Sequence, residues 1–233
     1  MKIKNILFAV TSTTLMSLVA PALATQIYTL NASAAGTFPG ISTFGTVTLD
    51  DIGTTVNVTV SLANGGVFAN TGNSTSGRTA FALMLGSGFS IALSGSSAES
   101  GIYQAVQPGG SLAQNPFGTF NAGITFKDTA ANGASGGYNS PITFAVTKTG
   151  GGAIGYSDFT TLSSGTGSQQ GTLFSADVGF KLGTSTAYST GNVATAVSRS
   201  TPDGDPRPVP EPTTLALLGL GLLGCAIARH RKN

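Results

Sequence analysis

Carboxylates are the residues of this chain that could do chemistry, because the other reactive side chains are almost missing from its long central part. The one histidine, His230, and the one cysteine, Cys225, both lie near the C-terminus. Nucleophilic triads and ordinary zinc sites depend on His or Cys, so the central part is predicted to contain neither. A pair of carboxylates at about 5–10 Å could still hydrolyse a glycosidic bond. The candidates for such a pair are Glu99, Asp128, Asp158 and Asp177.

No two of these carboxylates share a recognisable motif, and the chain has no tryptophan to stack on a sugar ring. Their ordinary interpretation is solvated acids in turns and at strand edges. Aspartates and backbone carbonyls could form a calcium site, but no D-x-D-x-D-G loop is present. The sequence therefore predicts no enzyme activity, no catalytic residue, no metal site and no cofactor. Carbohydrate binding would need exposed aromatic side chains, and the ones to consider are Tyr103, Tyr138, Tyr156 and Tyr188.

The distribution of charge argues against nucleic-acid binding. Residues 25–208 contain six Lys or Arg and eight Asp or Glu, so the central part is near −2 although the whole chain is +2. Charged residues make up 9% of the chain, whereas globular proteins usually have about 25%. Binding to phosphates needs a basic surface, which six scattered cations do not make. The many glycines and threonines are typical of an extracellular β protein.

The elements that must position these side chains are predicted to be strands. Val56, Val58 and Val60 alternate with polar residues and therefore share one face of a strand. Similar alternation recurs in residues 46–49, 81–85, 89–93, 120–126, 142–146, 174–180 and 193–197. About eight short antiparallel strands predict an all-β fold. We expect a β-sandwich of jelly-roll or immunoglobulin-like type, although a closed barrel would satisfy the same pattern.

Two local features add to this prediction. Asp50 and Asp51 lie between two alternating segments and are expected to cap a hairpin turn. Residues 156–162 are expected to form one helical turn in a body that otherwise has no helical period.

The first 24 residues have the pattern of a secretory signal peptide. A short basic segment, MKIKN, precedes an apolar stretch, and small residues follow at Ala22 and Ala24. This arrangement predicts a signal helix at residues 1–24 and a signal-peptidase cut before Thr25. The alternative is an N-terminal membrane anchor that stays. With cleavage, the ectodomain would be residues 25–197.

The C-terminal part combines a linker with an apolar segment. Residues 198–208 are rich in proline and read as an extended linker. Residues 213–228 carry no charge, and a helix of this length would span about 24 Å of a hydrocarbon core of about 30 Å. The basic residues that follow are expected to stay cytoplasmic and to stop transfer, which leaves the body outside; they are Arg229, Arg231 and Lys232. A core helix is the alternative for residues 213–228.

These C-terminal features together resemble the PEP-CTERM sorting signal of exported proteins from Gram-negative bacteria. The resemblance covers residues 209–233, with the motif Pro210-Glu211-Pro212 followed by the apolar helix and the basic end 229–233. It implies recognition by an exosortase, a membrane-embedded cysteine protease, and a cut near the motif. It further implies transfer to the cell surface or an exopolysaccharide matrix. The same tail is also catalogued as an ice-binding protein C-terminal domain, a label that is no evidence of ice binding.

The body has a fainter similarity to ectodomains that carry this tail, through VNVTVSLANGGVFANTG, ITFAVTKTGGG and TLFSADVGF. Those ectodomains are mostly uncharacterised, so the similarity implies a β-rich body and no activity. We expect a non-enzymatic surface or matrix protein that is held transiently in the inner membrane with its C-terminus in the cytoplasm. Its expected partners are signal peptidase, exosortase and matrix components. The alternatives are a carbohydrate-binding or carbohydrate-active matrix protein and a permanently anchored single-pass membrane protein.

Overall fold

The computed structural model describes residues 24–34, 36–70, 78–99, 101–127, 133–139 and 141–195. The predicted signal helix up to residue 23, the linker and the whole C-terminal sorting segment lie outside the described residues. The predicted membrane helix at residues 213–228 is therefore not tested by the structure. In the described part of the chain, no helix is long and apolar enough to span a membrane.

The described residues form fourteen strands and two short helices. The strands are β1 (Ala24–Ser33), β2 (Gly45–Asp51), β3 (Thr55–Leu62), β4 (Val67–Asn70), β5 (Thr79–Leu83), β6 (Phe89–Leu93), β7 (Tyr103–Val106), β8 (Leu112–Gln114), β9 (Gly118–Phe120), β10 (Ala122–Phe126), β11 (Gly133–Asn139), β12 (Ile142–Lys148), β13 (Phe174–Lys181) and β14 (Tyr188–Thr195). The helices are α1 (Gly95–Glu99) and the 3-10 turn η2 (Tyr156–Phe159), and η2 confirms the helical turn expected there.

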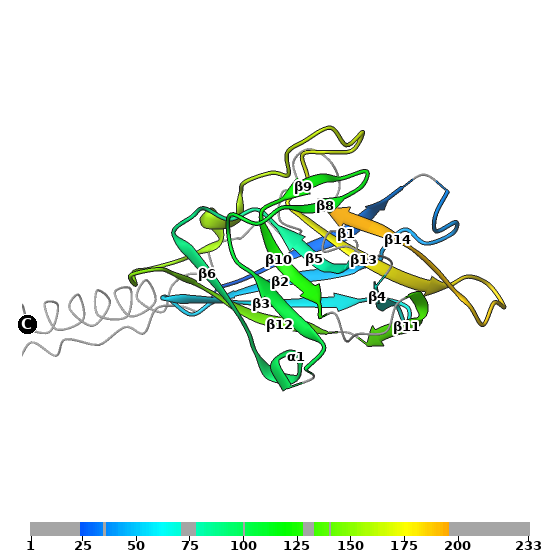
Figure 1. The fold of residues 1–233 in the computed structure, drawn as a ribbon, viewed down its shortest axis with the longest axis horizontal. Coiled ribbons are helices and arrows are strands. Elements are labelled where there is room, and N and C mark those ends of the chain that lie inside the picture. The colour runs from blue at the N-terminus through cyan, green and yellow to red at the C-terminus, as the bar shows by residue number, and fades with distance from the viewer. Residues whose placement is uncertain are drawn as a thin grey trace, which may run out of the picture. The chain divides into compact units, whose positions relative to one another are not determined.

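One rolled antiparallel sheet makes up most of the fold (Figure 1). Its strands follow the order β6-β12-β3-β2-β1-β14-β13-β5-β10-β7, while β4 pairs with β13 and β11 pairs with β4. A separate hairpin consists of β8 and β9. The antiparallel all-β prediction is confirmed, whereas the sandwich of two large packed sheets is not, because twelve strands belong to one nearly closed sheet. Alternation identifies the buried face of each strand without identifying its hydrogen-bonded neighbour, so the sequence could not distinguish a sandwich from a nearly closed roll.

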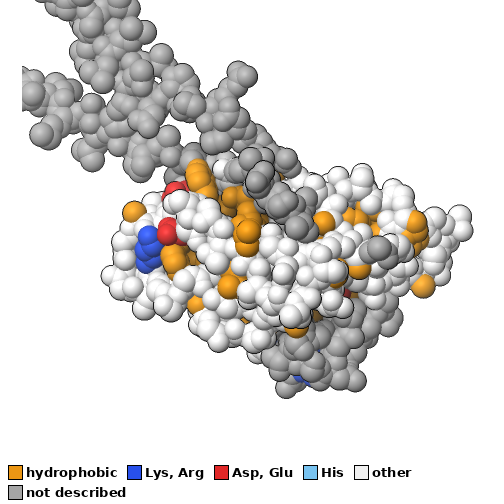
Figure 2. Space-filling model, turned by 90° about the horizontal axis from the view of Figure 1, so that it is seen from above, with side chains coloured by type: hydrophobic (Ala, Val, Ile, Leu, Met, Phe, Trp, Pro, Cys, Tyr) orange, Lys and Arg blue, Asp and Glu red, His pale blue; other side chains and the backbone are white. Residues whose placement is uncertain are grey.

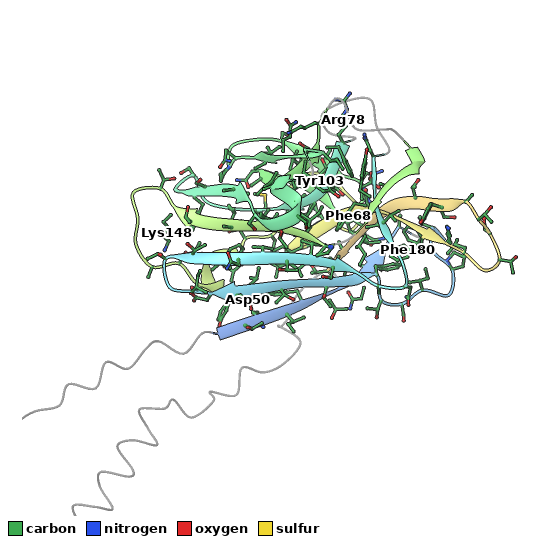
Figure 3. All side chains as sticks on the ribbon, turned by 90° about the horizontal axis from the view of Figure 1, so that it is seen from below. Asp50, Phe68, Arg78, Tyr103, Lys148 and Phe180 are labelled. Atoms are coloured by element: carbon green, nitrogen blue, oxygen red, sulfur yellow. The ribbon has the colours of Figure 1, made fainter. Side chains whose placement is uncertain are left out.

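The inward faces of the roll meet in one apolar core. In β2 and β3 every second residue is buried, as the alternation predicts. Phe81 is fully buried and has its ring centroid 5.9 Å from that of Phe174 and 5.8 Å from that of Phe144. Tyr28 packs edge-on against Phe174 at 5.0 Å. Figure 3 shows Phe68 and Phe180 in the interior of the same roll. Aromatic side chains from strands far apart in sequence therefore fill the centre.

The outside of the roll is covered on one side only. All residues of β5 and β10 are buried on both faces, because the β8–β9 hairpin lies against them. Leu112, Phe117 and Phe120 form a second apolar cluster with Ala82 of β5 and Ala194 of β14. The single strand predicted over residues 120–126 is therefore wrong. Asn121 separates two strands there, with Phe120 in the outer cluster and Ile124 in the main core.

Two side-chain amides take the place of backbone pairing in this sheet. The Asn121 amide nitrogen donates to the Leu85 carbonyl at 2.7 Å, and its oxygen accepts from the Leu85 amide at 2.9 Å. The Gln107 amide makes the same two bonds with Ile91, at 2.8 and 2.9 Å. Because Gln107 follows β7 and Ile91 lies in β6, this second clamp bridges the two end strands of the roll.

We predict that Phe81→Ala lowers the free energy of unfolding by about 3–5 kcal/mol, since it empties a fully buried ring site. The control is Ile27→Ala, where the side chain is 42% exposed and the expected loss is under about 1 kcal/mol. Urea denaturation of the two variants measures both values. Equal losses would contradict the placement of the core.

Candidate functional site

The carboxylates considered for a catalytic pair lie on three different elements. Glu99 ends α1, Asp158 lies in η2 and Asp177 is buried in β13 at 3% exposure. Asp128 is outside the described residues. The Asp158 carboxylate accepts a hydrogen bond from the Gly155 amide at 3.1 Å and forms an ion pair with the Lys148 ammonium at 3.3 Å. Within the described ranges, no three His, Cys, Asp or Glu side chains group in a way that could hold a metal ion.

The four tyrosines do not form one aromatic platform. Tyr103 is 5% exposed and packs with Phe126 and Tyr138, at centroid distances of 5.3 and 6.2 Å. Tyr156 belongs to η2, and Tyr188 begins β14, where the Lys181 ammonium lies 5.1 Å from its ring centroid. Tyr103 is therefore a core residue with Tyr138 packed beside it, while Tyr156 and Tyr188 lie on other elements.

Burial raises the pKa of Tyr103 far above its ordinary value, and the nearby Tyr138 phenol raises it further. Its hydroxyl has no hydrogen-bond partner among the residues that the structure describes. The neutral phenol is therefore the form that this site accepts. The pKa of Tyr28 and that of Tyr156 are also raised, in each case mainly by burial.

Four charged side chains, those of Asp50, Asp51, Lys148 and Asp158, lie near one end of the roll, whereas Arg78 lies apart from them. Figure 3 shows Asp50 and Lys148 toward that end. Figure 2 shows a largely white surface on which blue and red side chains lie close together. Asp51 accepts a bond from the Gly53 amide at 2.8 Å, which confirms its role in the β2–β3 turn. The Asp51 charge also contributes to the raised pKa of Tyr156, after burial. Asp50 accepts a bond from the Thr25 hydroxyl at 2.6 Å.

The predicted signal-peptidase site meets the fold at this same end. Ala22 lies outside the described residues, whereas Ala24 and Thr25 are the first two residues of β1. Ala24 pairs with Asp51, and Thr25 pairs with Asp50. The bond between Ala24 and Thr25 therefore lies within a hydrogen-bonded strand of the folded body.

The outer face of β12, β3, β2 and β1 is rich in hydroxyl groups. Cross-strand rows join Thr143 to Thr59 and Thr48, and the next residue in that row is the exposed Ile27. The other polar side chains on this face are Thr25, Thr29, Thr46, Thr55, Asn57, Ser61 and Thr147, while its one carboxylate among the described residues is Asp50. This face offers hydrogen-bonding groups with almost no charge.

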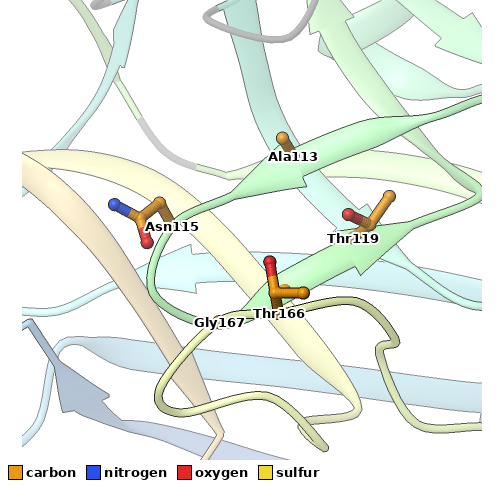
Figure 4. Close-up of a pocket in the computed structure, with 6 residues that line it drawn as sticks. Ala113, Asn115, Thr119, Thr166 and Gly167 are labelled. Atoms are coloured by element: carbon orange, nitrogen blue, oxygen red, sulfur yellow. The ribbon is translucent and has the colours of Figure 1, made fainter.

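A shallow pocket of about 130 Å³ lies between the β8–β9 hairpin and the loop that follows η2 (Figure 4). None of its side chains is ionisable, and those that bear polar atoms are Asn115, Thr119 and Thr166. Ala113, Gly118 and Gly167 complete the lining, and a side chain at Gly167 would collide with the backbone of Pro116. No sequence pattern predicts this pocket, because its residues come from a hairpin and a loop that are distant in the chain.

The loop beside the pocket is held by one buried hydroxyl. Ser163 Oγ donates to the Phe117 carbonyl at 2.6 Å and accepts from the backbone amides of Gly171 and Thr172 at 3.0 and 3.1 Å. These bonds fix the loop against the hairpin, so the pocket is preformed. It can bind a small neutral polar group, and it contains no acid, base or nucleophile for a reaction.

Comparison with known proteins identifies the C-terminal segment. Residues 208–232 match the family model described as PEP-CTERM protein-sorting motif. The match contains the predicted motif Pro210-Glu211-Pro212 and confirms the resemblance. No curated protein and no solved structure matches the chain.

We predict that the free energy of unfolding of Tyr103→Phe falls less steeply with rising alkaline pH than that of the parent protein. The pKa of Tyr103 is raised in the folded state, so above about pH 10 the unfolded chain releases the phenol proton first. Stability from this group is complete below that pH and then falls by up to about 1.4 kcal/mol per pH unit. The measurement is urea denaturation from pH 8 to about pH 11.5 for both proteins. Parallel curves would show that Tyr103 is not buried as described.

Proposed function

We propose that this protein is an exported, non-enzymatic β protein of the cell surface or extracellular matrix, released or transferred by exosortase processing. The observation that carries the proposal is the sorting-motif match at residues 208–232, which supports export and exosortase as the processing partner. In this scheme signal peptidase removes residues 1–24 during translocation. The basic end at residues 229–233 then holds the C-terminus in the cytoplasm until the cut.

The chemistry of the body supports a role that does not depend on catalysis. The described carboxylates considered for a catalytic pair lie on separate elements, and one of them already pairs with Lys148. The hydroxyl-rich face of β12, β3, β2 and β1 suits contact with neutral hydrated material rather than with a charged partner. This surface supports the proposed role in the matrix. We propose neutral matrix polymers as the material that it contacts.

Replacing Pro210, Glu211 and Pro212 together with alanine is expected to leave the C-terminal segment uncut and the protein in the inner-membrane fraction. The matched control is Pro202→Ala with Pro206→Ala, which changes the linker outside the matched segment. Fractionation and mass spectrometry of the C-terminus in the native host measure the result. If the parent protein itself keeps residues up to Asn233, it is a permanent single-pass anchor and the processing proposal is wrong.

Carbohydrate binding is the second candidate function, and the neutral pocket is the observation that favours it. The amide of Asn115 and the hydroxyls of Thr119 and Thr166 can hydrogen-bond to a sugar unit. Because none of these groups is charged, the pocket suits an uncharged polysaccharide. This candidate does not use the four tyrosines.

We predict that Asn115→Ala with Thr166→Ala weakens binding to neutral exopolysaccharide from the host by about tenfold, as expected from the loss of two neutral hydrogen bonds. Thr48→Ala on the outer sheet face is the control and should bind like the parent. Isothermal titration or polysaccharide pull-down reports the affinity. Unchanged affinity in the double variant would show that this pocket is not the carbohydrate-binding site.

A further inference from the structure

We infer that signal-peptide removal creates a charged N-terminus at Thr25 that forms an ion pair with Asp50 on the neighbouring strand. The inference rests on the proposed removal of residues 1–24. It goes beyond that proposal, because neither the sorting motif nor the fold assigns a partner to the new α-ammonium group.

The geometry that carries it is the start of β1. Thr25 and Asp50 are direct cross-strand partners, and the Thr25 hydroxyl donates to Asp50 Oδ1 at 2.6 Å. The backbone nitrogen and Oγ1 of one threonine are at most about 4 Å apart. The new ammonium therefore lies within about 7 Å of this carboxylate, close enough for the opposite charge to raise the pKa of the amine.

The other charged groups at this end do not replace Asp50 as the partner. Asp51 is the next residue of β2 and already accepts the Gly53 amide. Asp158 of η2 pairs with Lys148 of β12, and Tyr156 is neutral at physiological pH, as an ordinary tyrosine is, with a pKa that burial raises further. On the opposite side of β1, the described part of β14 ends at Thr195, which pairs with Leu30. Asp50 thus presents an oxygen toward Thr25 from the adjacent strand.

The same placement fixes the order of two events. A protease needs its target bond in an accessible extended chain, yet residues 24–30 pair along their length with β2. The cut must therefore precede the docking of β1. The strand that flanks β1 on its other side is β14, the last described strand, so the signal peptidase acts while the body is still incomplete.

The test compares the exported protein with three variants. Intact mass and N-terminal sequencing establish whether the chain begins at Thr25, and the labelling rate of the α-amino group against pH gives its pKa. The variants are Asp50→Asn, the matched control Asp158→Asn, and an insertion of one glycine between Ala24 and Thr25 that moves the ammonium away. Urea denaturation confirms that each variant is folded.

We expect Asp50→Asn and the glycine insertion to lower the α-amino pKa by about half a unit to one unit, as for a solvent-exposed pair, while Asp158→Asn leaves it unchanged. Equal values in all four proteins, or a first residue other than Thr25, would overturn the inference. The C-terminal mass in the same spectra reports exosortase processing separately, so failure of the ion pair and failure of the sorting proposal give different results.

Discussion

The rolled sheet depends on the hydrogen bonds between β1 and its two neighbours. β1 is flanked by β2 on one side and by β14 on the other, so the first and last described strands are adjacent. The roll cannot close until β14, which ends at Thr195, has emerged, about 160 residues after the end of β1 at Ser33. Pairing between such distant segments is slow, which in the proposed scheme leaves time for N-terminal processing before the roll closes.

A second constraint is the asymmetry between the two sides of the roll. The β8–β9 hairpin covers the outside of β5 and β10, while the outside of β3 and β2 faces solvent with threonine, serine and asparagine. On the covered side, Ser163 bonds the pocket loop to the hairpin, and the Ser175 hydroxyl donates to Gln114 at 3.1 Å, which ties the hairpin to β13. Neutral surfaces on both sides are consistent with the proposed contact with hydrated material.

The sequence predicts the strands whose two faces differ in polarity. Val56, Val58 and Val60 identify the inward face of β3 without ambiguity. It fails where both faces are apolar: Phe81 and Ala82 of β5 enter different clusters, and only the position of the hairpin decides this. Strand neighbours could not be predicted either, because pairing such as β1 with β14 leaves no local pattern. The sorting motif was readable since its three parts are contiguous, whereas the pocket joins loops distant in the chain.

The two hydrogen bonds between Gln107 and Ile91 affect how molecules of this protein can associate with one another. An open sheet has two edges whose free amides and carbonyls can extend into the sheet of a neighbouring molecule and start a fibril. Here the edges β6 and β7 face one another, and a single carboxamide occupies the Ile91 backbone groups at their junction. This junction favours separate particles over filaments, and in the proposed setting at the cell surface any order among the molecules would come from the surrounding material.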